Sequence, residues 1–430
     1  MTLFPDLPSL STLSALARTS EQQLLSLPEP ADRGPDDRAT AAAIHQTLRA
    51  ARSHYLSSHV DTIYNAVTDN HRLPLRLPDL LESITTAYPG ILPSPHLFTL
   101  ESGRVQADKE GFEIDQAILL RAVLRSPTSG PHLLESMLRP TPRSLSLLDT
   151  FQATGDLRLH SVHLSRQDGI THLTLIREDC LNAEDCQQVD DMETAVDLAL
   201  LDPTTHVAAV RGGHMTHPRY KNKRVFSSGI NLKRLHAGDI SLVDFLLRRE
   251  LGYISKILRG TTTDTDWRSP TVEKPWLAAV DTFAIGGGAQ LLHTFDRVIA
   301  ASDSYYCLPA AQEGIVPGMA NLRLTRSVGA RVARQILLWG RTIHATDPEA
   351  SLLFDEVVPP DHMDTTVAEA ANRLDNAAVL TNRKMLNLAE EPQDTFRHYA
   401  AEFALQQALR IYSQDVLTKV SRFTTAGRNP

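Results

Sequence analysis

Three consecutive glycines, Gly286–Gly288, follow the apolar segment 276–280 and precede residues 289–295, whose composition is helical. A chain that turns through glycine from a strand into a helix presents backbone N–H groups at the helix N-terminus, which carries partial positive charge. Such a turn suits an anion or a developing oxyanion, and a plain tight turn would need the same glycines. A dinucleotide-binding loop fits less well, because Leu291 stands where its third glycine is required.

The hydrophobic pattern changes near residue 155. Before it the composition is helical; after it the apolar period switches between 2 and 3.6 residues, which predicts a layered α/β fold. Asp168-Gly169 joins two expected strands, 158–165 and 170–176, into a hairpin. We expect a helical N-terminal domain (1–155), an α/β core (156–360) and a C-terminal helical region (361–430). Helices are expected at 11–27, 41–66, 77–88, 112–124, 186–200 and 242–257, and further strands at 206–210, 276–280, 297–301, 305–308 and 353–358.

Bulk properties narrow the range of functions. The 430 residues carry a formal net charge of −8, which argues against a nucleic-acid partner because phosphate binding needs a basic surface. The first residues, Met-Thr-Leu-Phe-Pro-Asp-Leu, lack the basic and apolar regions of a signal peptide. No window holds 18 uninterrupted apolar residues. We expect no membrane partner and a cytoplasmic location.

The cysteines and histidines form no recognisable site. Cys180, Cys186 and Cys307 are an odd number without a disulfide pattern, so we expect reduced thiols that are buried or half-buried. The 17 histidines form no H-E-x-x-H motif or similar cluster. The sequence thus contains no recognisable metal-binding motif, although a site assembled from distant side chains stays open.

A second loop, Phe226-Ser227-Ser228-Gly229-Ile230-Asn231-Leu232, follows the strand expected at 206–210. Together with Leu181-Asn182-Ala183 and the AIGGGAQL turn, in this order and at these separations, it resembles the crotonase superfamily of enoyl-CoA hydratases and isomerases over about residues 157–360. The resemblance implies a crotonase-like β-β-α spiral core and a homotrimer or a hexamer built as a dimer of trimers. It also implies that the backbone N–H groups of Ile230 and Gly287 hold a thioester oxygen. The neighbouring positions expected to contact the acyl-CoA are Ser228, Gly229, Asn231 and Gly286.

Two positions depart from the hydratase pattern. Hydratases of this superfamily carry one glutamate three residues after the oxyanion glycine and a second after the proline of a later strand; here Gln290 and Ala310 stand there. A neutral amide cannot accept a proton as a general base. The addition of water to an enoyl-CoA is therefore not expected.

Within the superfamily, the chain is most similar to the cofactor-independent dioxygenases of glycopeptide-antibiotic biosynthesis. The segments that carry this likeness are LVDFLLRRELGYI, GGGAQLL and EGIVPG, together with the helical N-terminal domain. It implies 3,5-dihydroxyphenylacetyl-CoA and O2 as substrates, 3,5-dihydroxyphenylglyoxylate and free CoA as products, and neither metal nor organic cofactor. The alternatives are a thioesterase or isomerase on the same fold, and a catalytically inactive scaffold.

The resemblance also assigns roles to charged and apolar residues near these loops. Glu184 would anchor a ring hydroxyl or assist proton removal, whereas on the sequence alone a favourable acid in the first turn of a helix explains it better. Arg249 would reach the acyl pocket and pair with Glu184 or with a phenolate, whereas Arg248 would not; a solvated helical face is the alternative. Gln290 completes the expected catalytic set.

A basic run, residues 217–224, precedes the second loop in this acidic protein. By the resemblance it holds the CoA nucleotide through His217, Arg219 and Tyr220, and an exposed loop explains the run equally well. Ile315 in the EGIVPG segment would line an apolar oxygen pocket. Packing in the core is an equally good reason for an isoleucine there.

Overall fold

The computed structural model describes residues 9–263 and 269–426, which divide into two compact units. The first unit combines residues up to 137 with residues 232–244 and those from 393 onward; the second holds residues 138–231 and 245–392. This division differs from the expected boundaries at 155 and 360. It also places the last two helices in the unit that contains the N-terminal helices.

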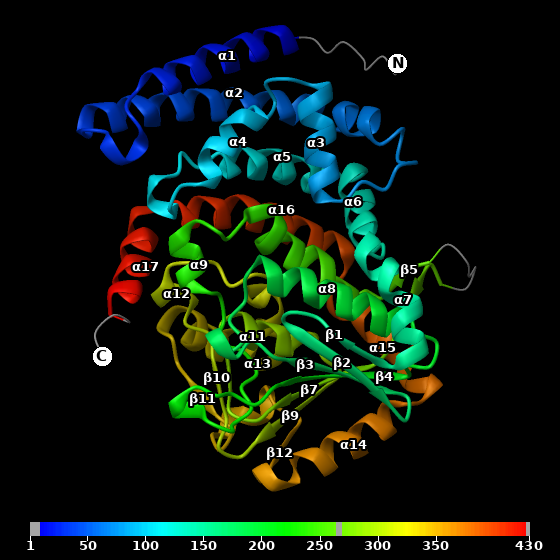
Figure 1. The fold of residues 1–430 in the computed structure, drawn as a ribbon. Helices are drawn as coiled ribbons and strands as arrows, with labels where there is room; N and C mark the ends of the chain where they lie inside the picture. The colour runs from blue at the N-terminus through cyan, green and yellow to red at the C-terminus, as the bar shows by residue number, and fades with distance from the viewer. Residues whose placement is uncertain (1–8, 264–268, 427–430) are drawn as a thin grey trace. The chain divides into compact units, whose positions relative to one another are not determined.

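The first unit is helical (Figure 1). Its α-helices are α1 (Leu10–Ser26), α2 (Pro35–Val67), α3 (Leu77–Ala87), α4 (Pro95–Ser102), α5 (Glu113–Arg125), α6 (Ser129–Met137), α9 (Leu232–Ala237), α16 (Gln393–Ile411) and α17 (Gln414–Ala426), with 3-10 turns η1 (Pro30–Asp32) and η2 (Gln106–Asp108). The four helices expected before residue 125 are confirmed to within a few residues, α2 starting earlier than expected. Helix α16 packs along α5, although the two lie far apart in the sequence.

The second unit contains a seven-stranded sheet in the order β1-β2-β3-β4-β7-β9-β12. The β1–β2 and β2–β3 pairs are antiparallel and the remaining pairs are parallel. Asp168 and Gly169 both have positive φ at the β2–β3 turn, as the predicted hairpin requires. The strands of this sheet are β1 (Asp156–Arg158), β2 (Val162–Gln167), β3 (Ile170–Leu175), β4 (Val207–Gly212), β7 (Trp276–Val280), β9 (Arg297–Ala301) and β12 (Glu356–Val358).

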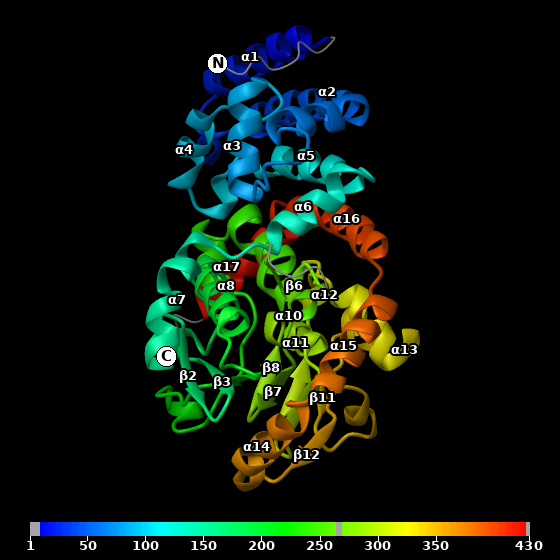
Figure 2. The ribbon, with the colours of Figure 1, turned by 90° about the vertical axis from the view of Figure 1, so that its right-hand side faces the viewer.

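Helices of the same unit lie on both faces of this sheet (Figures 1 and 2). On one face, Met363 and Val367 of α14 (Met363–Leu374) pack on alternate residues of β4, β7 and β9. On the other, α8 (Cys186–Leu201) contacts β2. The remaining α-helices are α7 (Pro142–Thr154), α10 (Ser255–Arg259), α11 (Gly287–Leu291), α12 (Ala310–Glu313), α13 (Ala320–Trp339) and α15 (Ala377–Glu390). The 3-10 turns are η3 (Glu178–Cys180), η4 (Pro218–Tyr220), η7 (Leu292–Thr294), η8 (Pro348–Leu352) and η9 (Pro360–His362).

The second unit also contains a three-stranded sheet, of which the sequence predicted only one strand. It runs β11-β10-β8, with β8 (Phe283–Ile285) parallel to β10 (Tyr305–Cys307) and β11 (Ile343–His344) antiparallel to it. Only β10 was expected, because β8 and β11 are too short for a periodic pattern. A separate pair, β5 (Thr261–Thr262) and β6 (Thr271–Val272), is antiparallel.

The segment from 242 to 257 corrects a local expectation. It was expected to be one α-helix, but two π-helical stretches, η5 (Leu242–Leu247) and η6 (Glu250–Ile254), precede α10, and Gly252 has non-helical dihedral angles. Wide turns of this kind are rare and change which side chains share a face. Among the described residues, no helix has the length and apolar character needed to cross a membrane.

Candidate active site

Strand β8 joins the two glycine loops. The N–H of Ile285 donates to the carbonyl of Ser227 at 2.9 Å, and Ser227 forms a bridge with Ala284. A methyl group built on Gly229 would lie 3.5 Å from the amide nitrogen of Gly287, so the two loops are in van der Waals contact. The structure therefore brings together two segments that lie almost sixty residues apart in the sequence.

The amides of Ile230 and Gly287 are available to a ligand. The amides on either side of Ile230 are occupied, because the N–H of Gly229 donates to the Ser227 hydroxyl at 3.1 Å and the N–H of Asn231 donates to the carbonyl of Glu184 at 2.8 Å. Gly287 begins α11, and the first N–H groups of a helix have no partner within it. Neither amide donates to a protein acceptor in the part of the chain that the structure describes. Two such donors side by side stabilise an oxyanion.

The glycines are required by close approach. A Cβ atom on Gly287 would lie 1.6 Å from Oε2 of Glu184, and one on Gly288 would lie 2.6 Å from Cβ of Ser227. Gly286 has a φ of 54°, in the left-handed region that favours glycine. The triple glycine therefore admits a carboxylate beside one of the two free amides.

Glu184 lies outside the helix that it was expected to open. Asp185 is the N-cap of α8, and Glu184 instead forms a bridge with Ile230. Its side chain is buried, at 5% exposure. Oε1 accepts three hydrogen bonds, from Nε and Nη2 of Arg249 at 3.1 Å each and from the Tyr253 hydroxyl at 3.2 Å. No donor among the described residues reaches Oε2, the oxygen beside Gly287.

Arg249 is the centre of the buried charge network, and only 3% of it is exposed. Besides Glu184, it donates to the carbonyl of Gly287 at 2.6 Å, to Glu250 at 2.8 Å and to Oε1 of Gln290 at 3.2 Å. Burial alone would lower the pKa of its guanidinium, but the carboxylates of Glu184 and Glu250 raise that pKa above its usual value. Arg249 therefore stays charged and fixes the carbonyl side of the glycine turn.

Tyr253 and Glu250 were not among the predicted site residues. Burial raises the pKa of both, and the neighbouring carboxylate of Glu184 adds to the effect at Tyr253. Tyr253 therefore remains a neutral donor. It follows Arg249 by four residues, and this spacing is the one sequence signal that places both on a common helical face.

Gln290 is half-buried and accepts a hydrogen bond from Arg249. Its amide holds the arginine and supplies no base. Gly318 leaves the room for this contact, since a Cβ there would lie 2.6 Å from Oε1 of Gln290. Ala310 is buried and carries no functional group. The carboxylate pair of a hydratase is thus absent from both positions.

The basic run is divided between different environments. Tyr220 packs edge-on against Phe283 of β8, with ring centroids 5.3 Å apart, and belongs to the apolar cluster that includes Ile285. His217 and Arg219 are exposed, and the Arg219 guanidinium lies 5.5 Å from the Tyr220 ring. Arg224 instead lines a pocket of about 410 Å³ with Arg211 and His172. Only part of the run is therefore tied to the strand that carries the glycine turn.

The remaining predicted residues surround the loops without forming a cluster. Ser228 donates through its hydroxyl to the carbonyl of Cys180 at 3.1 Å, and Asn231 is buried. Ile315 is half-buried just beyond α12, and its N–H donates to Ala310 at 3.0 Å. All three cysteines are half-buried, as expected. Burial raises the pKa of the Cys180 thiol to about 11, so it is not a thiolate nucleophile at neutral pH.

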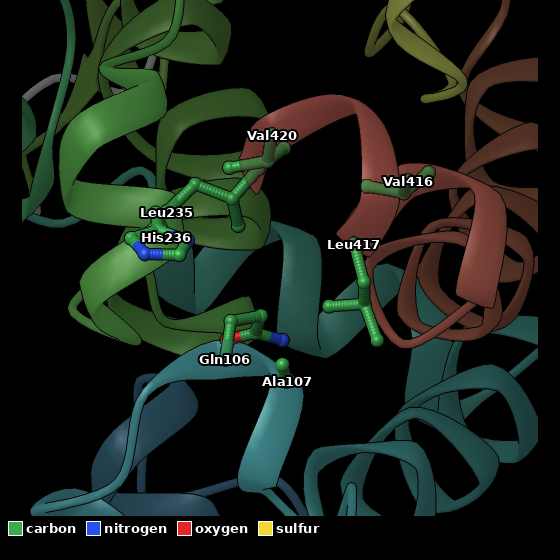
Figure 3. A pocket seen from close by; sticks show the side chains of 7 residues that line it. All are labelled: Gln106, Ala107, Leu235, His236, Val416, Leu417 and Val420. Carbon is green, nitrogen blue, oxygen red and sulfur yellow. The ribbon is translucent and has the colours of Figure 1, made fainter. Parts of the chain in front are cut away.

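Two further observations concern alternative sites. In residues 9–263 and 269–426, no group of three or more His, Cys, Asp or Glu side chains is arranged to hold a metal ion. A small pocket of about 60 Å³ lies in the helical unit (Figure 3), where its lining is mostly apolar. None of the predicted site residues lines it. The residues that do are Gln106, Ala107, Leu235, His236, Val416, Leu417 and Val420.

Comparisons with known proteins identify a family and relatives for this chain. Residues 165–414 match the family described as enoyl-CoA hydratase/isomerase. The chain is 56% identical, over 97% of its length and 96% of the relative, to a (3,5-dihydroxyphenyl)acetyl-CoA 1,2-dioxygenase of Amycolatopsis orientalis. It is 29% identical to a probable enoyl-CoA hydratase of Rhizobium meliloti, over 47% of this chain and 70% of that one.

Solved structures show the same fold over 62% of the chain. Pseudomonas aeruginosa OdaA superposes with a TM-score of 0.52 at 22% identity, over 62% of this chain and 99% of its own. An enoyl-CoA hydratase of Mycobacterium avium subsp. paratuberculosis superposes with a TM-score of 0.51 at 20% identity, over 62% and 99%. The predicted crotonase-like core is confirmed.

Proposed function

The chain belongs to the enoyl-CoA hydratase/isomerase family, and from that membership we propose that it is a dioxygenase that converts 3,5-dihydroxyphenylacetyl-CoA and O2 into 3,5-dihydroxyphenylglyoxylate and free CoA. The observation that carries the proposal is the 56% identity, over nearly the whole of both chains, to a dioxygenase named for this acyl-CoA. Identity that extends through the helical N-terminal region goes beyond what the shared fold requires. The activity is that of an oxidoreductase in antibiotic biosynthesis.

The two free amides support a reaction through a thioester enolate. The Cα of an arylacetyl thioester is both benzylic and next to a carbonyl, so its proton is acidic. When the proton leaves, charge moves onto the thioester oxygen, where the N–H groups of Ile230 and Gly287 stabilise it. Without carboxylates at positions 290 and 310, water is not activated for addition, and the carbanion persists to meet O2.

The atoms and electrons of the proposed reaction balance without another reductant. The carbanion reduces O2 and forms a peroxide at Cα, and the peroxide attacks the thioester carbonyl and expels the CoA thiolate. Cleavage of the O–O bond with loss of the second Cα hydrogen leaves the keto acid. All electrons come from the substrate, so the reaction calls for neither a metal nor an organic cofactor.

Glu184 is proposed to face the substrate through Oε2. Its other oxygen is saturated by Arg249 and Tyr253, which leaves Oε2 free beside an oxyanion donor. From there it would accept the Cα proton or bind a ring hydroxyl. Arg249 and Gln290 fix its position, while Ser228, Gly229, Asn231, Gly286 and Ile315 would border the acyl chain and O2, and His217, Arg219 and Tyr220 the CoA nucleotide.

The proposal includes the setting of the enzyme. We expect a homotrimer or a dimer of trimers in the cytoplasm. The resemblance to the crotonase superfamily implies the trimer-based assembly.

The direct test is oxygen uptake by purified, chelator-treated protein mixed with 3,5-dihydroxyphenylacetyl-CoA. One O2 should be consumed per CoA released, and label from 18O2 should enter the glyoxylate. CoA release that continues unchanged under strict anaerobiosis would identify a thioesterase instead. No turnover of either kind, from a protein that binds the thioester, would indicate an inactive scaffold. Dependence on added iron, copper or flavin would overturn the cofactor-free mechanism and leave the oxygenase assignment standing.

A further inference from the structure

We propose that Glu193 is a positioning residue, which acts with Gly252 as a brace that sets Arg249 against Glu184. This inference rests on the proposed function for its catalytic consequence. The contacts from which it is argued involve only residues of the second unit.

Glu193 lies on α8 and its side chain is fully buried, with 0% exposure. Its Oε2 accepts from Nε of Arg248 at 2.6 Å, and its Oε1 lies 2.9 Å from Nζ of Lys256. The two cations are eight residues apart on the segment that carries Arg249. The Glu193 carboxylate thus contacts two cations, Arg248 and Lys256, that lie on either side of residue 252, the midpoint of the stretch 248–256.

Gly252 is the midpoint. Its dihedral angles, φ −92° and ψ −108°, are non-helical and interrupt the helical path inside η6. A Cβ atom there would lie 2.9 Å from Oε1 and 3.2 Å from the carboxyl carbon of Glu193. Because Gly252 has no side chain, its backbone can pack directly against the Glu193 carboxylate. The wide π-helical turns on either side accommodate the local change in backbone direction.

This contact separates two adjacent arginines. Arg248 turns toward α8, where it also meets Asp190 at 2.6 Å. Arg249 turns the other way, toward Glu184, Gln290 and the glycine turn. Without the brace, Asp190 and Asp197 of α8 would still pair with Arg248 and Lys256, but the one carboxylate that contacts both cations and packs against Gly252 would be lost.

The brace and the catalytic carboxylate share one support. Glu184 directly precedes Asp185, the N-cap of α8, and Glu193 lies further along the same helix. The distance between Glu184 and Arg249 therefore depends on how α8 contacts the stretch 248–256. Lys256 adds a second tie through Asp197 at 2.7 Å, and Asp197 itself accepts from the N–H of Thr141 at 2.8 Å.

A double-mutant cycle tests the inference. Glu193→Gln keeps the shape but removes the charge, and we expect at least a tenfold fall in kcat/KM. In an Arg249→Lys background the same change should cause no further fall, because the arginine that it positions is already gone. Equal losses in both backgrounds would refute the inference, as would wild-type kinetics of Glu193→Gln alongside an impaired Arg249→Lys.

The matched control is Glu110→Gln, which removes another buried carboxylate paired with an arginine, Arg33 at 2.6 Å. It should lower the melting temperature and leave kcat/KM unchanged, so a loss of kcat/KM equal to that of Glu193→Gln would refute a specific role for the brace.

If Glu193→Gln does not fold, Gly252→Ala takes its place in the cycle with the same expectations. A crystal structure of either variant should show Arg249 withdrawn from Glu184, and an unchanged pair would overturn the brace. This readout stands even if the wild type consumes no oxygen, which would refute the proposed function alone.

Discussion

Oε1 of Glu184 accepts hydrogen bonds from both Nε and Nη2 of Arg249, each at 3.1 Å, from a residue 65 positions away. The two side chains are almost wholly buried, and a buried charge is tolerated only when it is paired and hydrogen-bonded. The pairing uses one carboxylate oxygen and leaves the other beside Gly287. A structural ion pair and a free acceptor are thus combined in one side chain.

The Gly287 amide should be essential for turnover. A side chain at this position would collide with Glu184, so a conventional substitution cannot isolate the amide. Replacing Gly287 by glycolic acid, which turns its amide into an ester, removes the N–H alone. We expect kcat to fall by roughly 10²–10³, as on loss of one oxyanion donor. The same replacement at Gly103, where nothing lies within 4 Å of a built Cβ, is the control; full activity of the Gly287 ester would exclude this donor.

Glu184→Gln should lower kcat/KM by about 10² or more, because general-base catalysis is worth about that factor. Exchange of the Cα hydrogen with D2O, measured without oxygen, identifies the role. If the variant loses this exchange, Glu184 removes the Cα proton. If the exchange is retained and KM is raised, Glu184 instead binds a ring hydroxyl of the substrate. Unchanged kinetics would remove Glu184 from the site.

Arg249→Lys should be nearly as damaging as removal of the side chain, since an ammonium group cannot serve Glu184, Glu250 and the Gly287 carbonyl in one plane. The measurement is kcat/KM alongside the melting temperature. Arg331→Ala, an exposed arginine on α13, serves as the matched control and should retain both. Wild-type activity of Arg249→Lys would show that charge alone suffices.

Arg219→Ala should weaken recognition of the CoA nucleotide. The guanidinium is exposed beside Tyr220, where it is free to meet a phosphate. KM should rise severalfold for the CoA thioester and stay constant for the N-acetylcysteamine thioester of the same acid, which lacks the nucleotide. An equal rise for both thioesters would contradict a nucleotide contact.

Glu391 should make folding sensitive to acid. Burial opposes its ionisation, but Arg323 and Arg259, at 2.9 Å and 2.6 Å, lower its pKa from 4.5 to about 2. Since the folded pKa is depressed, the contribution is fully present above pH 4.5 and is lost as pH falls toward 2. This contribution to the free energy of unfolding is about 3 kcal/mol. Melting temperatures of Glu391→Gln should be lower than wild type at neutral pH, and the difference should shrink below pH 4.5 and vanish as pH falls through about 2; a constant difference would contradict the lowered pKa.

Several features of the fold could be read from local sequence. The Asp168-Gly169 turn, the buried strand at 276–280 and the N-terminal helices were expected within a few residues, because dihedral preferences and apolar periodicity act over short stretches. Strand β8 could not be read, since three residues carry no period and its pairing partners lie elsewhere in the chain. The π turns around Arg249 were also missed, because a wide turn has no distinct apolar period.

The sequence by itself determined which groups could take part in the chemistry. Glycines at 229 and 286–288 limited the backbone to two loops with free amides, and Gln290 and Ala310 excluded the hydratase carboxylates. Only the tertiary structure decided how these groups are used: that Oε1 of Glu184 is occupied while Oε2 is free, that Tyr253 joins the pair, and that Glu193 fits beneath Gly252. Backbone preferences are encoded within a few residues. A contact such as that between Glu184 and Arg249, which lie 65 positions apart, depends on packing, which local sequence does not specify.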